Sequence, residues 1–204
     1  DLKRRVWLAG FGASGRKAQG VHDPLYARAV VLSDGSQTVA IVALDLIGFF
    51  HEDVEEARRR LGWTGPRSYL FLASTHVHSG PDTLGMWGPA PGISGVDRHY
   101  RDRVLDAVVE LVRELSGRLE EADLAYARTD VEPGGLCRDS RDPVVIDPEL
   151  DALRLRALKT GAPIATVVRW SCHPEVLWDD NNLVSADYPG EVCGAVEKSA
   201  GGAC

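Results

Sequence analysis

Apolar residues fall into short continuous or alternating runs along the chain, and these runs predict β-strands. The runs at 26–32 and 38–44 flank the pair Asp34-Gly35, and Asp-Gly between two apolar runs is a strong signal for a β-hairpin. A third run, 69–73, predicts a buried strand. Further strands are predicted at 6–11, 122–128, 152–158 and 164–170.

Three segments have the pattern of helices. Segment 52–61 carries acids in its first turn and arginines in its last, as the helix dipole favours. Segment 97–115 has apolar residues at helical spacing behind a capping Asp97, and segment 188–199 follows a capping Asp187. Because hairpins alternate with helices, the order predicts an α/β fold with a layered mixed β-sheet flanked by helices, in a single domain.

Composition narrows the class of protein. The chain has 204 residues, of which 44% are hydrophobic and 26% charged, as in an ordinary globular protein. Its net charge of -7 argues against nucleic-acid binding, which needs a basic surface. No apolar run approaches the roughly 20 residues that would span a bilayer. The chain begins at Asp1 without a signal peptide, which leaves export open, and we expect a secreted or periplasmic location rather than a cytoplasmic one.

Four cysteines are spaced too widely for a CxxC motif, which argues against a zinc ribbon or a thioredoxin-like site. Cys193 and Cys204 would close a short disulfide loop in an exported protein and would be buried thiols in a cytosolic one. The other two are Cys137 and Cys172.

A glycine-rich segment, Gly10-Phe11-Gly12-Ala13-Ser14-Gly15, matches the G-x-G-x-x-G pattern of dinucleotide-binding proteins. That pattern needs a helix directly after it, and the following residues 16–24 contain glycine and proline instead. The hypothesis of an NAD-dependent dehydrogenase rests on this pattern alone. We expect the glycines to allow close approach of the backbone to a pocket.

The pair His76 and His78 follows the predicted strand 69–73 and precedes Gly80-Pro81. Side chains two apart on a strand share a face, so the two imidazoles are expected to project together from the strand's end. Paired imidazoles suit a zinc site or a proton-transfer site. The alternative is two polar residues where a strand runs out into solvent.

A third histidine, His173, also ends an apolar strand, 164–170, and is followed by Pro174, which stops pairing. Like His76, it follows the end of an apolar strand, and it is therefore a second candidate metal ligand. The neighbouring Cys172 points to the opposite face of a strand and is not expected to share the same metal. A half-buried structural histidine is the alternative.

Other polar residues are weaker candidates. Asp45 ends the strand 38–44, either as a terminator or as a partner that orients a histidine. Arg138 and Arg141 lie in an irregular segment, where either could form a salt bridge or stabilise developing negative charge. The remaining candidates are expected at the surface or in a solvated turn: His22, His51, His99 and 179–182.

Four segments resemble the neutral/alkaline ceramidases and their bacterial relatives. The run Ser74-Thr75-His76-Val77-His78-Ser79-Gly80-Pro81 is the most specific of them. In order and spacing the four cover nearly the whole chain. The other three are 9–12 with 22–29, 43–46, and 172–174 with 185–190.

The resemblance implies a zinc-dependent amidohydrolase that cleaves a linear C–N amide bond, with a small-molecule or ceramide-like lipid amide as substrate. His76 and His173 would hold Zn²⁺, and His78 would polarise the amide or shuttle a proton. Arg141, with Arg138 second, would help to bind the oxyanion.

By the same resemblance, residues 1–204 form the N-terminal catalytic domain, and the remaining zinc ligands are expected beyond Cys204. A non-catalytic metal-binding or structural domain is the alternative function. The sequence does not indicate an oligomeric state.

Overall fold

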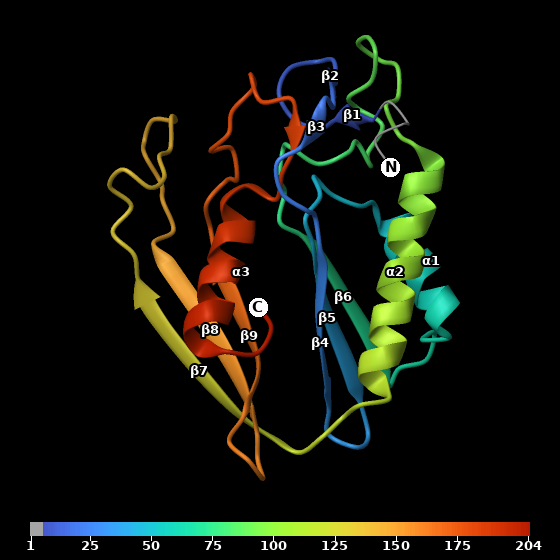
Figure 1. Ribbon diagram of the computed structural model, residues 1–204, viewed down its shortest axis with the longest axis vertical. Helices are drawn as coiled ribbons and strands as arrows, with labels where there is room; N and C mark the ends of the chain where they lie inside the picture. The colour runs from blue at the N-terminus through green and yellow to red at the C-terminus, as the bar shows by residue number, and fades with distance from the viewer. Residues whose placement is uncertain (1–5) are drawn as a thin grey trace. The chain divides into compact units, whose positions relative to one another are not determined.

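The computed structural model describes residues 6–204, which form two compact units (Figure 1). The first comprises the described residues up to Leu119 together with Pro174–Glu191, and the second comprises Glu120–His173 and Val192–Cys204. The first unit contains β1 Trp7–Leu8, β2 Arg16–Lys17, β3 Gly20–Val21, β4 Ala27–Ser33, β5 Thr38–Leu44, α1 His51–Leu61, β6 Ser68–Ser74, α2 Arg98–Ser116 and β10 Leu183–Val184. The second contains β7 Ala122–Asp130, β8 Glu149–Ala157 and β9 Pro163–Trp170, and α3 Asp187–Ala200 runs from the first unit into the second.

The main sheet of the first unit has the strand order β4-β5-β6. The Asp34-Gly35 turn joins β4 and β5 as an antiparallel hairpin, as predicted, whereas β5 and β6 are parallel and are connected through α1. The sheet is therefore mixed, and the predicted α/β class is confirmed. The strands are divided among four sheets, a detail that the apolar runs alone did not specify. Two short sheets pair β1 with β2 and β10 with β3.

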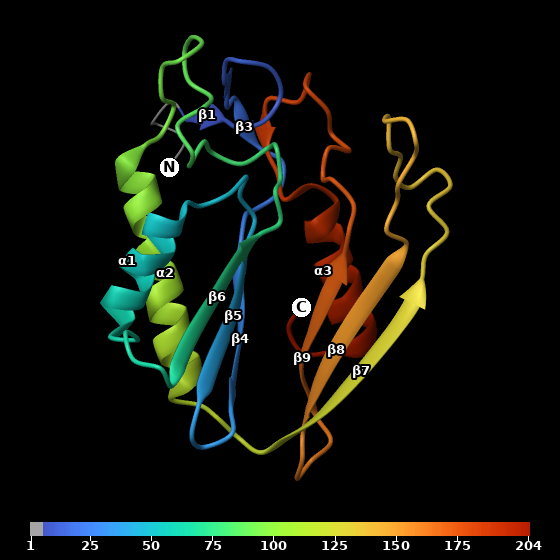
Figure 2. The ribbon, with the colours of Figure 1, turned by 180° about the vertical axis from the view of Figure 1, so that it is seen from behind.

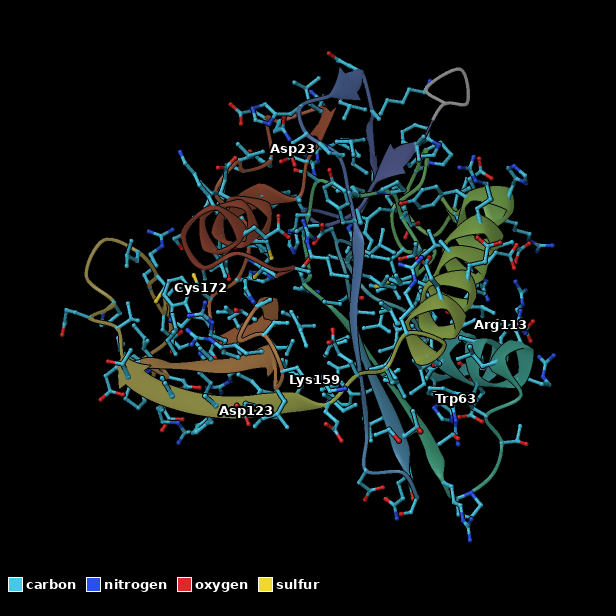
Figure 3. All side chains as sticks on the ribbon, turned by 60° about the horizontal axis from the view of Figure 1, so that its bottom comes forward. Asp23, Trp63, Arg113, Asp123, Lys159 and Cys172 are labelled. Carbon is cyan, nitrogen blue, oxygen red and sulfur yellow. The ribbon has the colours of Figure 1, made fainter. Side chains whose placement is uncertain are left out.

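Helices α1 and α2 pack together beside this sheet (Figure 2). Alternate residues of β5 and the apolar stripe of α2 form the core, because one face of each element is apolar. Tyr100 of α2 packs against this core, and burial raises its pKa to about 12. At the far end of α2, Arg113 donates a hydrogen bond to the carbonyl of Arg60, and Figure 3 labels Arg113 beside Trp63. The buried residues of this core cluster are Ala40, Val42, Leu44, Leu46, Val108 and Val112.

The predicted helix boundaries agree with the structure to within two residues. Asp97 caps α2 by accepting hydrogen bonds from the backbone N–H groups of His99 and Tyr100. None of the helices among residues 6–204 is long and apolar enough to cross a bilayer. The predicted strand 6–11 is shorter than expected, since only Trp7–Leu8 pairs.

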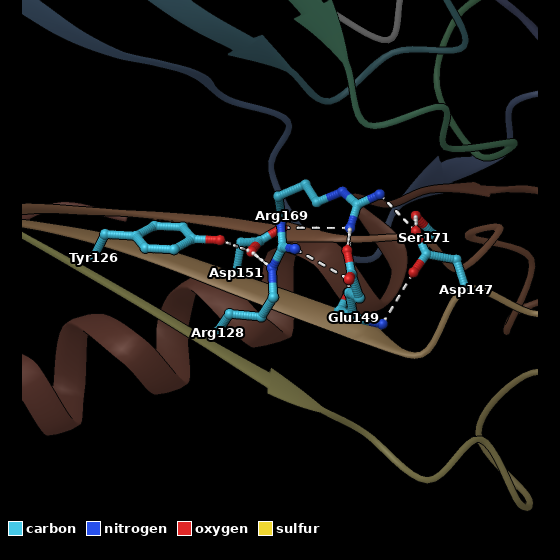
Figure 4. Close-up of polar contacts among 7 residues, drawn as sticks. All are labelled: Tyr126, Arg128, Asp147, Glu149, Asp151, Arg169 and Ser171. Atoms are coloured by element: carbon cyan, nitrogen blue, oxygen red, sulfur yellow. Dashed lines mark hydrogen bonds and ion pairs between the residues drawn. The ribbon is translucent and has the colours of Figure 1, made fainter.

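The second unit is an antiparallel meander with the strand order β7-β8-β9. Arg128 and Arg169, on the two outer strands, both meet carboxylates of neighbouring residues (Figure 4). Arg128 of β7 binds Asp151 and Glu149 of β8, and Arg169 of β9 binds Asp151 and Asp147. The Arg128 guanidinium lowers the pKa of Asp151. These pairs are exposed, so they define register more than they add stability.

Asp53 offers a test of how α1 and α2 are held together. Its carboxylate is 1% exposed and accepts hydrogen bonds from the backbone N–H of Phe50 and from Nε of Arg101 at 2.8 Å. Replacing Asp53 with alanine is expected to lower the free energy of unfolding by about 2 kcal/mol, because both donors lose their acceptor. Chemical denaturation measures this change.

The matched control is Glu55→Ala on the same helix. The Glu55 carboxylate is exposed and pairs with Arg58 one turn further along the helix, so its loss should cost less than about 0.5 kcal/mol. Equal effects of the two substitutions would contradict a special role for Asp53.

Candidate functional site

His76 and His78 lie beyond the end of β6, which stops at Ser74. The backbone N–H of Thr75 donates to Leu44 and that of His76 donates to Leu46, so the turn is tied to the end of β5. His76 has φ 69°, a left-handed conformation that is uncommon for a residue with a side chain. The two histidines do lie together beyond the strand's end, as predicted, but the alternation of side chains along a strand is not what places them there. A strained turn brings them together instead.

The two imidazoles lie edge to face, with their ring centroids 5.3 Å apart. Nδ1 of His76 is 2.7 Å from the carbonyl oxygen of Ile47. Because a carbonyl only accepts hydrogen bonds, Nδ1 is the protonated nitrogen and Nε2 has the lone pair that a metal would bind.

His78 is 8% exposed, and its ring packs against the backbone of the glycine-rich segment. A Cβ on Gly10 would lie 2.3 Å from Cγ and Nδ1 of His78, so no side chain fits at that position. The ring of Phe11 meets the His78 ring edge-on at 4.7 Å. Arg16 donates hydrogen bonds to the carbonyls of Ala9 and His78 and ties the two segments together. The predicted role of the glycines, close backbone approach, is confirmed, and no helix follows them: residues 16–17 form β2.

A carboxylate that sequence analysis did not single out faces His78. Oε1 of Glu175 is 3.4 Å from Nδ1 of His78. Glu175 follows Pro174, so its nearness in sequence to His173 was the available signal. A carboxylate beside an imidazole stabilises its protonated form and fixes its orientation.

Asp187 holds the segment that carries Glu175, and this role also differs from the simple helix cap that was predicted. It is 7% exposed, and its carboxylate accepts hydrogen bonds from the backbone N–H groups of Val176, Leu177 and Tyr188. One acid therefore organises both the start of α3 and the turn that follows Pro174.

Left-handed backbone is concentrated in this part of the chain. Among the described residues, the non-glycine positions with positive φ include His76, Phe11 and Asp187, which contact or flank the histidine segments. The fourth is Trp178, whose ring lies 5.3 Å from that of Phe11. Such conformations cost of order 1–3 kcal/mol each and are typical of functional sites.

His173 follows the end of β9 and is bonded to Pro174, with which the chain returns to the first unit. One ligand atom from each of His76, His78 and His173 lies within 4.8 Å of the others. Three imidazole nitrogens at this separation have the chemistry and number of donors of a catalytic zinc site. Together they could hold a metal ion.

The other predicted site residues, Arg141, Arg138 and Asp45, are bound to other partners or exposed. Arg141 is exposed and pairs with Asp139, and this hydrogen bond from the Arg141 guanidinium lowers the pKa of Asp139. Arg138 is exposed in the same irregular segment. The role of either arginine at the oxyanion stays a prediction. Asp45 is 1% exposed and binds the backbone N–H of Tyr26 and the guanidinium of Arg28, as a strand terminator would.

The turn 179–182 was predicted to be solvated, and three further histidines were predicted to lie at the surface. Asn181 is not merely solvated, because its amide donates to Oγ of Ser79 at 3.0 Å and to the carbonyl of Leu183. His22, His51 and His99 are exposed, as predicted.

Comparison with known proteins decides the family. The sequence model of the N-terminal part of the neutral/alkaline non-lysosomal ceramidases matches residues 4–203. The chain belongs to this family. The resemblance carried by the His76 and His78 segment is thereby confirmed.

Relatives of the chain are longer than the chain itself. It is 26% identical to the neutral ceramidase of Mycobacterium tuberculosis (strain ATCC 25618 / H37Rv) over 96% of its own length and 34% of that protein. The crystal structure of the neutral ceramidase from Pseudomonas aeruginosa shares the fold, with a TM-score of 0.82 and 21% identity, over 98% of this chain and 35% of that one. A ceramidase complexed with C2 matches with a TM-score of 0.78 and 20% identity, over 95% of this chain and 32% of the other. The chain thus spans about a third of the length of these ceramidases.

Substitutions at Gly10 and Gly12 test how much the close packing of the glycine backbone against His78 stabilises the fold. Both have positive φ, +72° and +66°, so alanine at either position adds backbone strain of about 1–2 kcal/mol. Only Gly10→Ala also forces its Cβ into the His78 ring, and we expect it to lower the free energy of unfolding by roughly 1–3 kcal/mol more than Gly12→Ala. Thermal or chemical denaturation compares the two variants. An equal loss in both would show that the close approach to His78 is unimportant.

Proposed function

We propose that this chain supplies the histidine part of a zinc-dependent amidohydrolase that cleaves a linear C–N amide bond in a ceramide-like N-acyl substrate. The supporting observation is the group of three imidazoles, whose ligand atoms lie within 4.8 Å of one another. Membership of the ceramidase family supports the same reaction class. When bound, zinc lowers the pKa of a bound water to about 7 and makes hydroxide available to attack a carbonyl.

His76 and His173 are proposed as the metal ligands. The carbonyl of Ile47 holds His76 with Nδ1 protonated, the arrangement common for histidines that bind metals through Nε2. This hydrogen bond leaves Nε2 of the neutral ring free to bind a metal.

His78 is proposed as the proton-transfer group, because its partner is an anion. The Glu175 carboxylate, 3.4 Å from Nδ1, stabilises the imidazolium that forms when His78 takes up a proton at Nε2. His78 would then return that proton to the leaving nitrogen. The Gly10 and Phe11 contacts keep the ring in place during both transfers.

Arg141 is proposed to stabilise the developing oxyanion, with Arg138 as the second candidate. A guanidinium remains protonated at all relevant pH values and donates up to five hydrogen bonds. The non-catalytic alternative is less favoured, since it gives no reason for a carboxylate to lie beside His78.

The ligand assignment predicts the metal content of the full-length protein. The wild-type protein should bind about one zinc per chain, and His76→Ala or His173→Ala should abolish this binding, because about three protein ligands hold a catalytic zinc. Metal analysis of the purified proteins measures the ratio, and His22→Ala, at an exposed histidine, is the matched control. Stoichiometric zinc in both ligand variants would exclude the assignment.

The assignment of His78 predicts a different outcome. His78→Ala should leave most of the zinc bound and lower the turnover number by about 10²–10⁴, the usual contribution of general acid–base catalysis. Metal analysis together with turnover of an N-acyl amide tests this. Loss of zinc equal to that of His76→Ala would make His78 a ligand instead.

A further inference from the structure

The loop of residues 83–96, which joins β6 to α2 through Asp82 and Asp97, is free of charged side chains over fourteen residues. This is unusual in a chain in which 26% of the residues are charged. Figure 1 shows the green loop projecting at the end of the first unit where β1 and β2 lie and α2 begins. Its sequence is rich in glycine and proline and contains Met86, Trp87 and Ile93.

The 83–96 loop is held rigidly at its base. Asp82 is 1% exposed, and its carboxylate accepts hydrogen bonds from the backbone N–H groups of Leu84, Gly85, Trp87 and Gly95. These four hydrogen bonds to one carboxylate fix both ends of the loop at one point. The conformation of the loop is therefore determined by its own hydrogen bonds to Asp82.

The two sides of the loop pack so closely that its apolar side chains do not fold between them. A Cβ on Gly88 would lie 2.0 Å from the carbonyl oxygen of Ile93, and one on Gly95 would lie 1.9 Å from that of Trp87. Met86 remains 58% exposed and Ile93 53% exposed. Packing within the loop therefore does not account for these two side chains.

The loop is coupled to the segment that seats His78. The indole N–H of Trp87 donates to the carbonyl of Gly12 at 3.2 Å, and the carbonyl of Gly88 accepts from Gly15 at 2.8 Å. Exposed basic residues flank this region: Lys17 follows the glycine-rich segment, and Arg98 begins α2. An apolar tip bordered by cations matches the chemistry of a lipid surface, where acyl chains lie beneath phosphate groups.

We propose that the 83–96 loop docks the protein on the surface of a lipid aggregate, with Met86 and Ile93 inserted among the acyl chains. This inference rests on the proposed function, because a hydrolase of ceramide-like amides must reach a substrate that resides in such aggregates. Docking through the loop would bring the His78 segment close to the lipid surface. The occupant is a phosphatidylcholine-type bilayer or micelle, since the overall charge of -7 does not favour strongly anionic lipids.

The first test uses Met86, which is the only methionine of the chain. Its exposed thioether should be oxidised by dilute hydrogen peroxide in the full-length protein, and phosphatidylcholine vesicles should slow this oxidation, because insertion removes the sulfur from water. Peptide mapping by mass spectrometry measures sulfoxide at Met86 with and without vesicles. Equal oxidation in both samples, or resistance to oxidation without vesicles, would overturn the proposal.

The second test compares Met86→Ser/Ile93→Ser with Phe71→Ser, at an equally exposed apolar residue of β6. The double variant should bind phosphatidylcholine vesicles about tenfold more weakly in sedimentation, because two apolar side chains no longer insert. Its turnover of long-chain ceramide in vesicles should fall by a similar factor, whereas turnover of a water-soluble short-chain amide should not change. Phe71→Ser should behave like the wild type in all three assays.

The outcomes separate the two proposals. Unchanged vesicle binding by the double variant would overturn the docking inference and leave the proposed hydrolysis intact. Wild-type protein that binds vesicles through the loop but hydrolyses neither amide would support docking and contradict the proposed function. Equal loss of turnover on both substrates would place the loop in the catalytic machinery and exclude a docking role.

Discussion

The close approach of Gly10 to His78 is the constraint on which the first unit's polar centre depends. The glycine backbone occupies the space that any side chain would need, and Arg16 joins the carbonyls on both sides of the contact. His78 is consequently buried against the Gly10 backbone and the Phe11 ring. The same contact gives the glycine-rich segment a structural role: Gly10 accommodates a protein ring, and the backbone then turns into β2 rather than into a helix.

Local features of the fold could be predicted from the sequence because short-range chemistry determines them. The Asp34-Gly35 hairpin, the Asp97 cap and the strand before His76 each depend on neighbouring residues, and the structure contains all of them. The histidines themselves could be selected because their residue type and position after a strand are visible in the sequence. The roles assigned to His76, His78, His173 and Arg141 remain predictions.

Contacts between distant segments could not be predicted in the same way. Nothing near His78 in sequence indicates that Glu175 lies beside it, and nothing near Val176 indicates that Asp187 will bind its backbone N–H. The left-handed conformation of His76 was also missed, because strand periodicity predicts a shared face without needing a turn. Each of these features arises from tertiary hydrogen bonding, which overrides the local pattern.

The exposed strand β7 has a consequence for the behaviour of the second unit. It is the outer strand of its sheet, and all nine of its residues are exposed in the structure. Unpaired edges of this length invite edge-to-edge association between molecules. Here Asp123, Arg128 and Asp130 place charge along the edge, and Arg128 is held in position by its carboxylate partners. The ion pairs across this sheet thus serve colloidal solubility: they make the strand a poor template for aggregation.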